Sequence, residues 1–145
     1  MKKRKFDEVN EELKNGYAQQ QWAQPVKRYC QTMLLRDDAE LIKEYRRRHE
    51  PQNVWQEIPR GMKEVGILQM EIYIHERTLF MIVETPLDFD WDTAFGRLAT
   101  LERQQEWEDY MANFQLAEPG AASAEKWKLM ERMFCMTDCL EYKQK

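Results

Sequence analysis

Apolar and polar residues alternate along several short segments, and this period of two predicts β-strands. Residues 26–35, "VKRYCQTMLL", are rich in β-forming residue types and predict a first strand. Residues 67–85 predict a hairpin with its turn near Glu76 and Arg77. We expect a last strand centred on residues 132–136, "RMFCM". These strands are suited to a single sheet.

Between the strands, apolar residues follow helical spacing. Residues 36–50 predict a helix with Asp37 or Asp38 as its N-cap. A less regular helical piece covers 54–66, and a longer helical region covers 88–114. The predicted order is β-α-β-β-α-β, which is typical of the ferredoxin-like arrangement and places the chain in the α+β class.

The first 25 residues differ from the rest and predict an extension of the domain. Apolar residues at helical spacing indicate a short helix that Gly16 ends, and a polar linker then runs to Pro25. Those apolar residues are Phe6, Val9, Leu13 and Tyr17. We therefore expect an N-terminal helical extension and linker at 1–25, followed by a single ferredoxin-like domain at 26–145.

The strand expected at 67–75 has two different faces. One face carries Met70, Ile72 and Ile74, and the other carries Glu71, Tyr73 and His75. Helices can cover the apolar face, whereas the polar and aromatic face is suited to a pocket or an interface. Because the helices of this arrangement lie on one side of the sheet, a second copy is the simplest cover for the other side. We expect a homodimer, with a lid formed by the N-terminal extension as the alternative.

Composition excludes several classes of protein. The chain has 145 residues, 43% hydrophobic and 33% charged, which fits one globular domain. Its 22 basic and 26 acidic residues give a net charge of −4, unlike the basic surface of a nucleic-acid-binding protein. No segment has the apolar length of a membrane span or the apolar region of a secretory signal. We therefore expect no membrane partner and a cytoplasmic location.

The three cysteines, Cys30, Cys135 and Cys139, predict reduced thiols rather than disulfides. If "CMTDC" belongs to a strand, its two sulfurs are too far apart to share one metal ion. A catalytic cysteine is not expected either, because each cysteine falls within a predicted strand. The segment "GMKEVG" lacks the lysine and serine of a phosphate-binding loop. We expect neither a metal nor a nucleotide.

His49 is the strongest candidate for chemistry. Leu41, Ile42, Tyr45 and His49 share one helical stripe that should face the core. A histidine there is either a buried structural residue or an acid/base group, since imidazole titrates near neutral pH. Tyr45 lies one turn earlier on the same face and can donate a hydrogen bond. The other histidine, His75, lies beside the hairpin turn and is expected at the surface.

Aromatic residues favour a sugar as the ligand. The chain has five tryptophans and six tyrosines, with Trp107 in the second helical region. A tryptophan near a histidine and tyrosines suits a sugar, because the C–H face of a sugar packs on aromatic rings while its hydroxyls need polar partners.

Three segments, "KEYRRRHEPQNVW", "GILQMEIYIHERTLFMIVE" and "QEWEDYM", occur in this order and resemble the L-rhamnose mutarotase family. The resemblance runs from about Val26 to Phe114 and resumes in "MERMFCM". It implies a cofactor-free dimeric α/β barrel that interconverts the α and β anomers of a 6-deoxy sugar. It also implies that His49 is the catalytic acid/base. The residues that it places against the substrate are Tyr45, Trp107, Tyr73 and Trp55.

The chain departs from this family pattern at two pocket positions. Met70 stands where the best-known bacterial form has a tyrosine, and Glu108 replaces the second of two consecutive tryptophans. The identity of the sugar therefore stays open, with L-rhamnose expected and L-fucose as the alternative. Two other readings are a different activity on the same fold, such as cofactor-independent oxidation of an aromatic, and a non-catalytic sugar-binding or interaction module.

Overall fold

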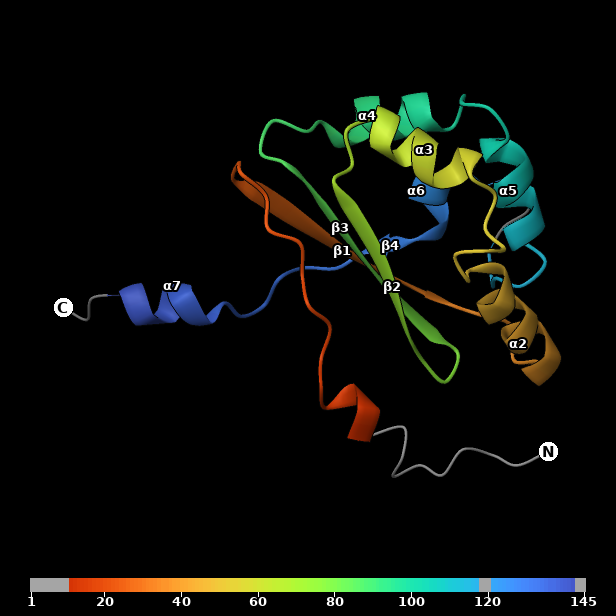
Figure 1. The fold of residues 1–145 in the computed structure, drawn as a ribbon, viewed down its shortest axis with the longest axis horizontal. Coiled ribbons are helices and arrows are strands. Elements are labelled where there is room, and N and C mark those ends of the chain that lie inside the picture. Colours follow the sequence, from red (N-terminus) through yellow and green to blue (C-terminus); the bar gives the residue numbers. More distant parts are fainter. Residues whose placement is uncertain (1–10, 118–120, 143–145) are drawn as a thin grey trace.

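The computed structural model describes residues 11–117 and 121–142. An antiparallel four-stranded sheet in the order β2-β3-β1-β4 forms its centre. Helices α2 to α6 lie on one side of the sheet, and the N-terminal segment and α7 lie on the other (Figure 1). The strands are β1 (Val26–Leu34), β2 (Gln69–His75), β3 (Thr78–Pro86) and β4 (Lys128–Leu129). The helices are α2 (Ala39–Arg48), α3 (Glu57–Glu64), α4 (Trp91–Leu98), α5 (Gln104–Met111), α6 (Ser123–Lys126) and α7 (Met136–Glu141). This architecture confirms the predicted ferredoxin-like α+β class.

The predicted hairpin forms with the turn where it was expected. His75 pairs with Thr78, so Glu76 and Arg77 make the turn between β2 and β3. Glu76 adopts a φ of 56°, the left-handed conformation that short hairpin turns require. Alternate residues of β3 are buried against the helices, as period-two alternation demands, and they are Leu79, Met81 and Val83.

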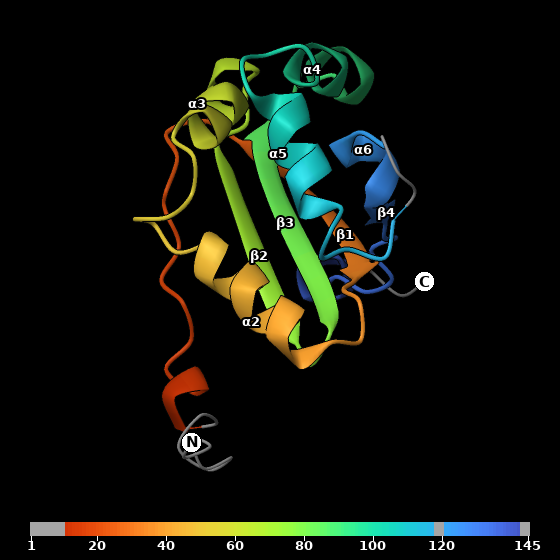
Figure 2. The same ribbon diagram turned by 90° about the vertical axis from the view of Figure 1, so that its right-hand side faces the viewer.

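Helix α2 begins and ends as the sequence indicates. The carboxylate of Asp38 accepts hydrogen bonds from the main-chain N–H groups of Glu40 and Leu41, so Asp38 is the N-cap. The arginine run at its end is turned largely to solvent, with Arg47 paired to Glu44 at 2.7 Å. The helix lies across β2 and β3, as Figure 2 shows.

The helical region predicted at 88–114 is divided into α4 and α5. Asp90 caps α4 by accepting a hydrogen bond from the N–H of Thr93 at 3.0 Å. The chain turns after Leu98, and Arg103 precedes α5 with a φ of 63°. This left-handed residue changes the direction of the chain, so that α5 lies beside α2 over the sheet (Figure 2).

The last strand lies earlier than predicted. β4 is Lys128–Leu129 and pairs with Thr32 and Gln31 of β1, whereas "RMFCM" is not part of the sheet. Met133 is 93% exposed and Phe134 is 66% exposed. The β-forming residues of this segment pair with no strand among the described residues, and the prediction of a strand there was wrong for that reason.

We refer to residues 130–142 as the C-terminal arm, which extends away from the domain (Figure 1). Cys135 is the N-cap of α7 and Cys139 lies within that helix, so the expectation that both lie in a strand was also wrong. All three cysteines are free thiols. No group of three histidine, cysteine or acidic residues suited to a metal ion occurs within 11–117 and 121–142.

The N-terminal segment is described from residue 11 onward. Residues 11–13 are helical, and Gly16 follows with a φ of 65°, the left-handed conformation in which glycine commonly ends helices. Phe6 and Val9, expected on this helix, lie outside the described residues. No helix in the described part of the chain is long and apolar enough to cross a bilayer.

Candidate active site

A cavity of about 290 Å³ lies between the sheet and the helices that cover it. Its floor is the apolar face of β2 and β3, where Met70, Ile72 and Met81 point toward the helices. Helices α2, α3 and α5 supply further walls. The lining from these helices, from the end of α4, from the loop between α2 and α3 and from the C-terminal segments is Tyr45, His49, Val54, Ile58, Pro59, Met62, Leu98, Trp107, Glu108, Met111, Gln115, Ser123 and Trp127.

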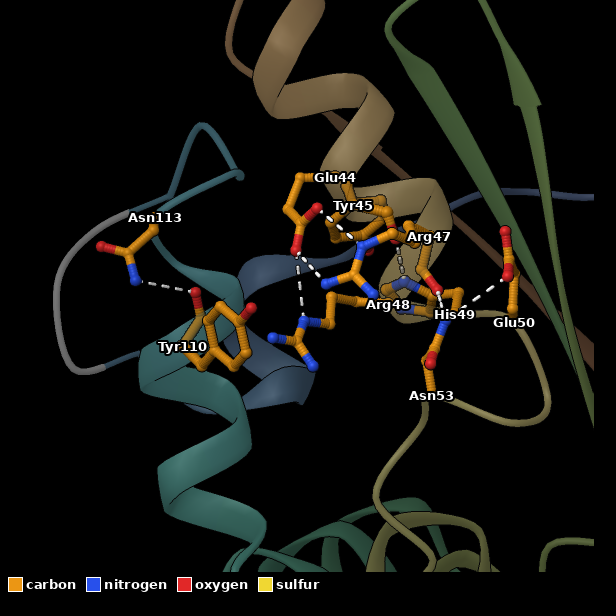
Figure 3. Close-up of polar contacts among 9 residues, drawn as sticks. All are labelled: Glu44, Tyr45, Arg47, Arg48, His49, Glu50, Asn53, Tyr110 and Asn113. Atoms are coloured by element: carbon orange, nitrogen blue, oxygen red, sulfur yellow. Dashed lines mark hydrogen bonds and ion pairs between the residues drawn. The ribbon is translucent and has the colours of Figure 1, made fainter.

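His49 lies at the C-terminal end of α2 with its ring on the wall of this cavity. Its Nδ1 atom is 2.7 Å from the main-chain oxygen of Tyr45 (Figure 3). Because a carbonyl oxygen can only accept, Nδ1 carries the hydrogen and Nε2 is left with its lone pair. Burial lowers the pKa of His49, and the hydrogen bond to Tyr45 offsets this in part. The ring is therefore a neutral base near pH 7.

Tyr45 packs directly on His49. Their ring centroids are 4.2 Å apart, and Tyr45 is only 3% exposed. The Tyr45 hydroxyl accepts a hydrogen bond from Nε2 of Gln115 at 3.4 Å. Burial raises the pKa of Tyr45, the bond from Gln115 opposes this, and the charge of Glu108 adds to the increase. The phenol therefore keeps its proton and can donate a hydrogen bond.

The two tryptophans expected at the site have different positions. Trp107 is buried, lines the cavity and has its ring centroid 5.6 Å from that of His49. Trp55 packs behind it, with ring centroids 5.2 Å apart, and is not part of the cavity wall. The guanidinium of Arg103 lies 3.9 Å from the centre of the Trp55 ring and covers it. Trp55 thus orients Trp107 from outside the cavity.

Tyr73, expected to contact the substrate, lies on the opposite face of β2 and does not line this cavity. Its hydroxyl donates to Glu71 at 3.2 Å, and its ring meets Tyr17 of the N-terminal segment at 5.6 Å. Strand alternation is the reason, since Met70 and Ile72 point into the cavity and the odd-numbered residues point away. The cavity therefore lies on the apolar face of the strand. His75 is exposed beside the hairpin, as expected.

A cluster of buried polar residues lies at the cavity wall. The sequence analysis did not predict this cluster. Glu108 is 7% exposed and Lys126 is 6% exposed, and their Oε2 and Nζ atoms are 2.9 Å apart. Gln104 donates to the other carboxylate oxygen of Glu108 at 2.9 Å. Gln115 is 3% exposed, and its Oε1 has no partner among the described residues. The family resemblance had placed Glu108 at a pocket position, whereas no local pattern indicates Lys126.

A second hollow of about 290 Å³ shares Tyr45 and His49 with the first cavity. It is bounded by α2 and by residues of β2 and β3, including Ile72, Ile74 and Leu79. His49 therefore lines both hollows. A base placed in this way can exchange protons with a ligand in the first cavity and with solvent in the second.

Comparisons with known proteins agree with this geometry. A sequence model of the L-rhamnose mutarotase family matches residues 28–136. An L-fucose mutarotase from Xanthomonas campestris pv. campestris is 35% identical over 119 residues, which cover 82% of this chain and 95% of that protein. The crystal structure of an L-rhamnose mutarotase from Formosa agariphila superposes with a TM-score of 0.57 at 25% identity, covering 76% of this chain and 98% of that one.

The match spans the sheet, the cavity and its helices, since it begins within β1 and ends at the first residue of α7. It includes both His49 and Tyr45, whose geometry suits proton transfer, as well as Trp107. Mutarotases are isomerases that act on the anomeric carbon of a sugar. The chain belongs to the L-rhamnose mutarotase family.

Proposed function

We propose that this protein interconverts the α and β anomers of a 6-deoxy sugar, L-rhamnose or L-fucose, with His49 as the catalytic base. The observation that carries the proposal is the 2.7 Å hydrogen bond from His49 Nδ1 to the Tyr45 carbonyl, which leaves Nε2 unprotonated at the cavity wall. Both sugars are proposed because the family model and the Xanthomonas relative carry different sugar names.

The reaction follows from these groups. Nε2 of His49 takes the proton of the anomeric hydroxyl, the carbonyl at C1 forms, and the bond from C1 to the ring oxygen breaks. The Tyr45 hydroxyl donates a hydrogen bond to the ring oxygen as negative charge develops there. The imidazolium of His49 then returns its proton to this oxygen. After rotation about C1–C2, the same steps in reverse close the ring on the other face of the carbonyl.

The cavity wall suits a sugar that lacks one hydroxyl. Trp107 and the apolar floor of the cavity offer surface for the C–H groups and the methyl carbon of a 6-deoxy sugar. Glu108 and Gln115 provide acceptors for its remaining hydroxyls. The proposed reaction neither oxidises nor reduces the sugar and forms no covalent intermediate, so it requires no cofactor.

Saturation-transfer NMR tests the proposal directly. Equilibrated L-rhamnose and L-fucose are each mixed with the protein, and exchange between the α and β signals is measured. We expect the wild type to accelerate exchange and His49→Ala to reduce it to the rate without protein, with the fold retained. His75→Ala is the matched control, since His75 is exposed at the hairpin. Sugar binding without exchange by the wild type would identify a non-catalytic binding module instead.

We also propose that the protein forms a homodimer, a dimeric α/β barrel in which the sheet faces opposite helices α2 to α6 meet. The face opposite the helices carries apolar residues such as Phe80 and Ile82, by strand alternation. The C-terminal arm exposes Met133 and Phe134. The family match continues through Met136, so this apolar segment belongs to the family sequence. A second copy can cover the face and arm together.

Two further proposals concern organisation and location. We propose that the domain covers 26–145 and that 1–25 form an extension, because β1 begins at Val26 and the family match begins at residue 28. We propose a cytoplasmic location, supported by the three free thiols, which are typical of a reducing compartment.

A further inference from the structure

A buried ion pair, Glu108 with Lys126, lies at the wall of the cavity. Glu108 and Lys126 form an ion pair that is almost fully removed from solvent. Burying two charges costs more free energy than a pair of this kind generally returns, and an apolar pair of similar volume is often as stable. Packing alone therefore does not account for charged residues at this position.

The contacts of this pair fix the orientation of the carboxylate. Nζ of Lys126 binds Glu108 twice, with Oε2 at 2.9 Å and the main-chain oxygen at 2.6 Å. Gln104 donates to Oε1 at 2.9 Å from one turn earlier on the same helix. Both oxygens of Glu108 are held, so the carboxylate cannot turn away from the cavity that it lines.

The carboxylate still has capacity to accept. A carboxylate offers about four acceptor positions, and Gln104 and Lys126 occupy one on each oxygen. Gln115 lines the same cavity and presents a buried Oε1 that has no partner among the described residues. A buried acceptor left unsatisfied costs free energy, which a ligand can recover by donating to it. Two acceptors at this wall match a ligand that is rich in hydroxyl donors.

We propose that Glu108 determines the specificity for the sugar by accepting a hydrogen bond from one ring hydroxyl, with Gln115 as a second acceptor and Lys126 as a positioning residue. This inference rests on the proposed function and assigns the discrimination between sugars to the part of the cavity wall that Glu108 and Gln115 form. The ligand class is a neutral pyranose with a hydroxyl directed at this wall. Sugars that carry a carboxylate or a phosphate at the same end are excluded by repulsion from Glu108.

The test compares Glu108→Gln with the wild type on L-rhamnose and on its 2-, 3- and 4-deoxy analogues. We expect the variant to raise KM for L-rhamnose about tenfold or more, because a hydrogen bond to a charged group is replaced by a neutral one. The value of kcat should change much less. One analogue lacks the hydroxyl that faces Glu108. For that analogue, the wild type and the variant should have the same KM.

Two further variants separate binding from folding. Glu108→Gln leaves Lys126 buried without its partner, so the double variant Glu108→Gln/Lys126→Met removes both charges and should fold if the single variant does not. We expect it to show the same pattern across the analogues. Glu106→Gln, on the exposed side of the same helix, is the control and should leave every KM unchanged. An equal effect of the Glu108 substitution on all four sugars would overturn the proposal.

The same experiment distinguishes failure of this inference from failure of the proposed function. If the wild type binds the sugars without accelerating exchange, the function is contradicted, and dissociation constants for the same variants and analogues decide the role of Glu108. If exchange occurs and Glu108→Gln discriminates among the analogues as the wild type does, only the specificity proposal fails. If the wild type neither binds nor exchanges any of these sugars, both are overturned.

Discussion

Nδ1 of His49 lies 2.7 Å from the main-chain oxygen of Tyr45, one helical turn earlier, and this contact determines which nitrogen of the ring faces the cavity. The helix that supplies His49 also supplies its hydrogen-bond partner, so the tautomer is fixed by local geometry. Burial keeps the ring neutral, and the same burial keeps the Tyr45 phenol protonated. A base and a donor are therefore available together.

The pH dependence of exchange should reflect the lowered pKa of His49. The base is active when neutral, so activity should persist as the pH falls through 6.5, the ordinary value for histidine, and decline only below it. Rates measured across this range, corrected for exchange without protein, give the midpoint. His75→Ala should leave the profile unchanged. A midpoint at or above 6.5 would contradict the neutral, buried ring.

Stability should depend on pH through the same group. The pKa of His49 is lower in the folded chain than in the unfolded one, so the unfolded state binds more protons between the two values. The free energy of unfolding should therefore decrease as the pH falls from about 6.5 toward the folded pKa. Chemical denaturation of the wild type and of His49→Gln over this range measures the difference. Parallel curves for the two proteins would show that His49 makes no such contribution.

Removal of the Tyr45 hydroxyl should reduce exchange and weaken the fold modestly. Tyr45→Phe removes the hydroxyl that accepts a hydrogen bond from the buried side-chain amide of Gln115. This loss should lower the free energy of unfolding by about 1–2 kcal/mol. Loss of the donor to the ring oxygen should lower kcat by roughly 10- to 100-fold. Tyr142→Phe, in an exposed position, is the control. Unchanged kcat in Tyr45→Phe would assign proton donation to another group or to water.

Substitution at Met70 should change the preference between L-rhamnose and L-fucose. Met70 lines the cavity from β2, so Met70→Tyr brings a hydroxyl and a larger ring into contact with the sugar. The measured quantity is the ratio of kcat/KM values for the two sugars. Tyr73→Phe, on the opposite face of the same strand, should leave this ratio as it is. If Met70→Tyr does not alter the ratio, this residue does not determine preference.

Charges on the C-terminal arm should dissociate the proposed dimer. Met133→Asp/Phe134→Asp places carboxylates on two adjacent exposed apolar residues of the arm and should convert the dimer to a monomer. Size-exclusion chromatography with light scattering measures the mass. Leu13→Asp tests the N-terminal extension in the same way and should not change the mass. A dimer that survives the arm substitutions would place the interface elsewhere.

Local pattern was sufficient for most of the fold and for the central pair of the site. Helix α2 shows its N-cap, its buried stripe and its end within consecutive residues, and His49 and Tyr45 share that stripe. The hairpin also depends on contacts between neighbouring segments. Short stretches of sequence determine helix α2 and the hairpin, and the structure has both where they were expected.

Features that depend on distant parts of the chain were not accessible from local pattern. Tyr73 is aromatic and close in sequence to cavity residues, but strand alternation directs it to the other face of the sheet. Lys126 reaches Glu108 from 18 positions away, a pairing that no local spacing indicates. The segment around Phe134 has the composition of a strand, and whether it pairs depends on a neighbour that its own chain does not supply.

The cavity lies on the helix-covered side of the sheet, and all the residues found to line it come from one chain. In a dimer joined through the opposite faces, the two sheets would lie between the two cavities. Neither cavity would then contain a side chain of the other subunit. Each subunit would then turn over independently, and the rate would follow sugar concentration along a simple hyperbola with a Hill coefficient of about one.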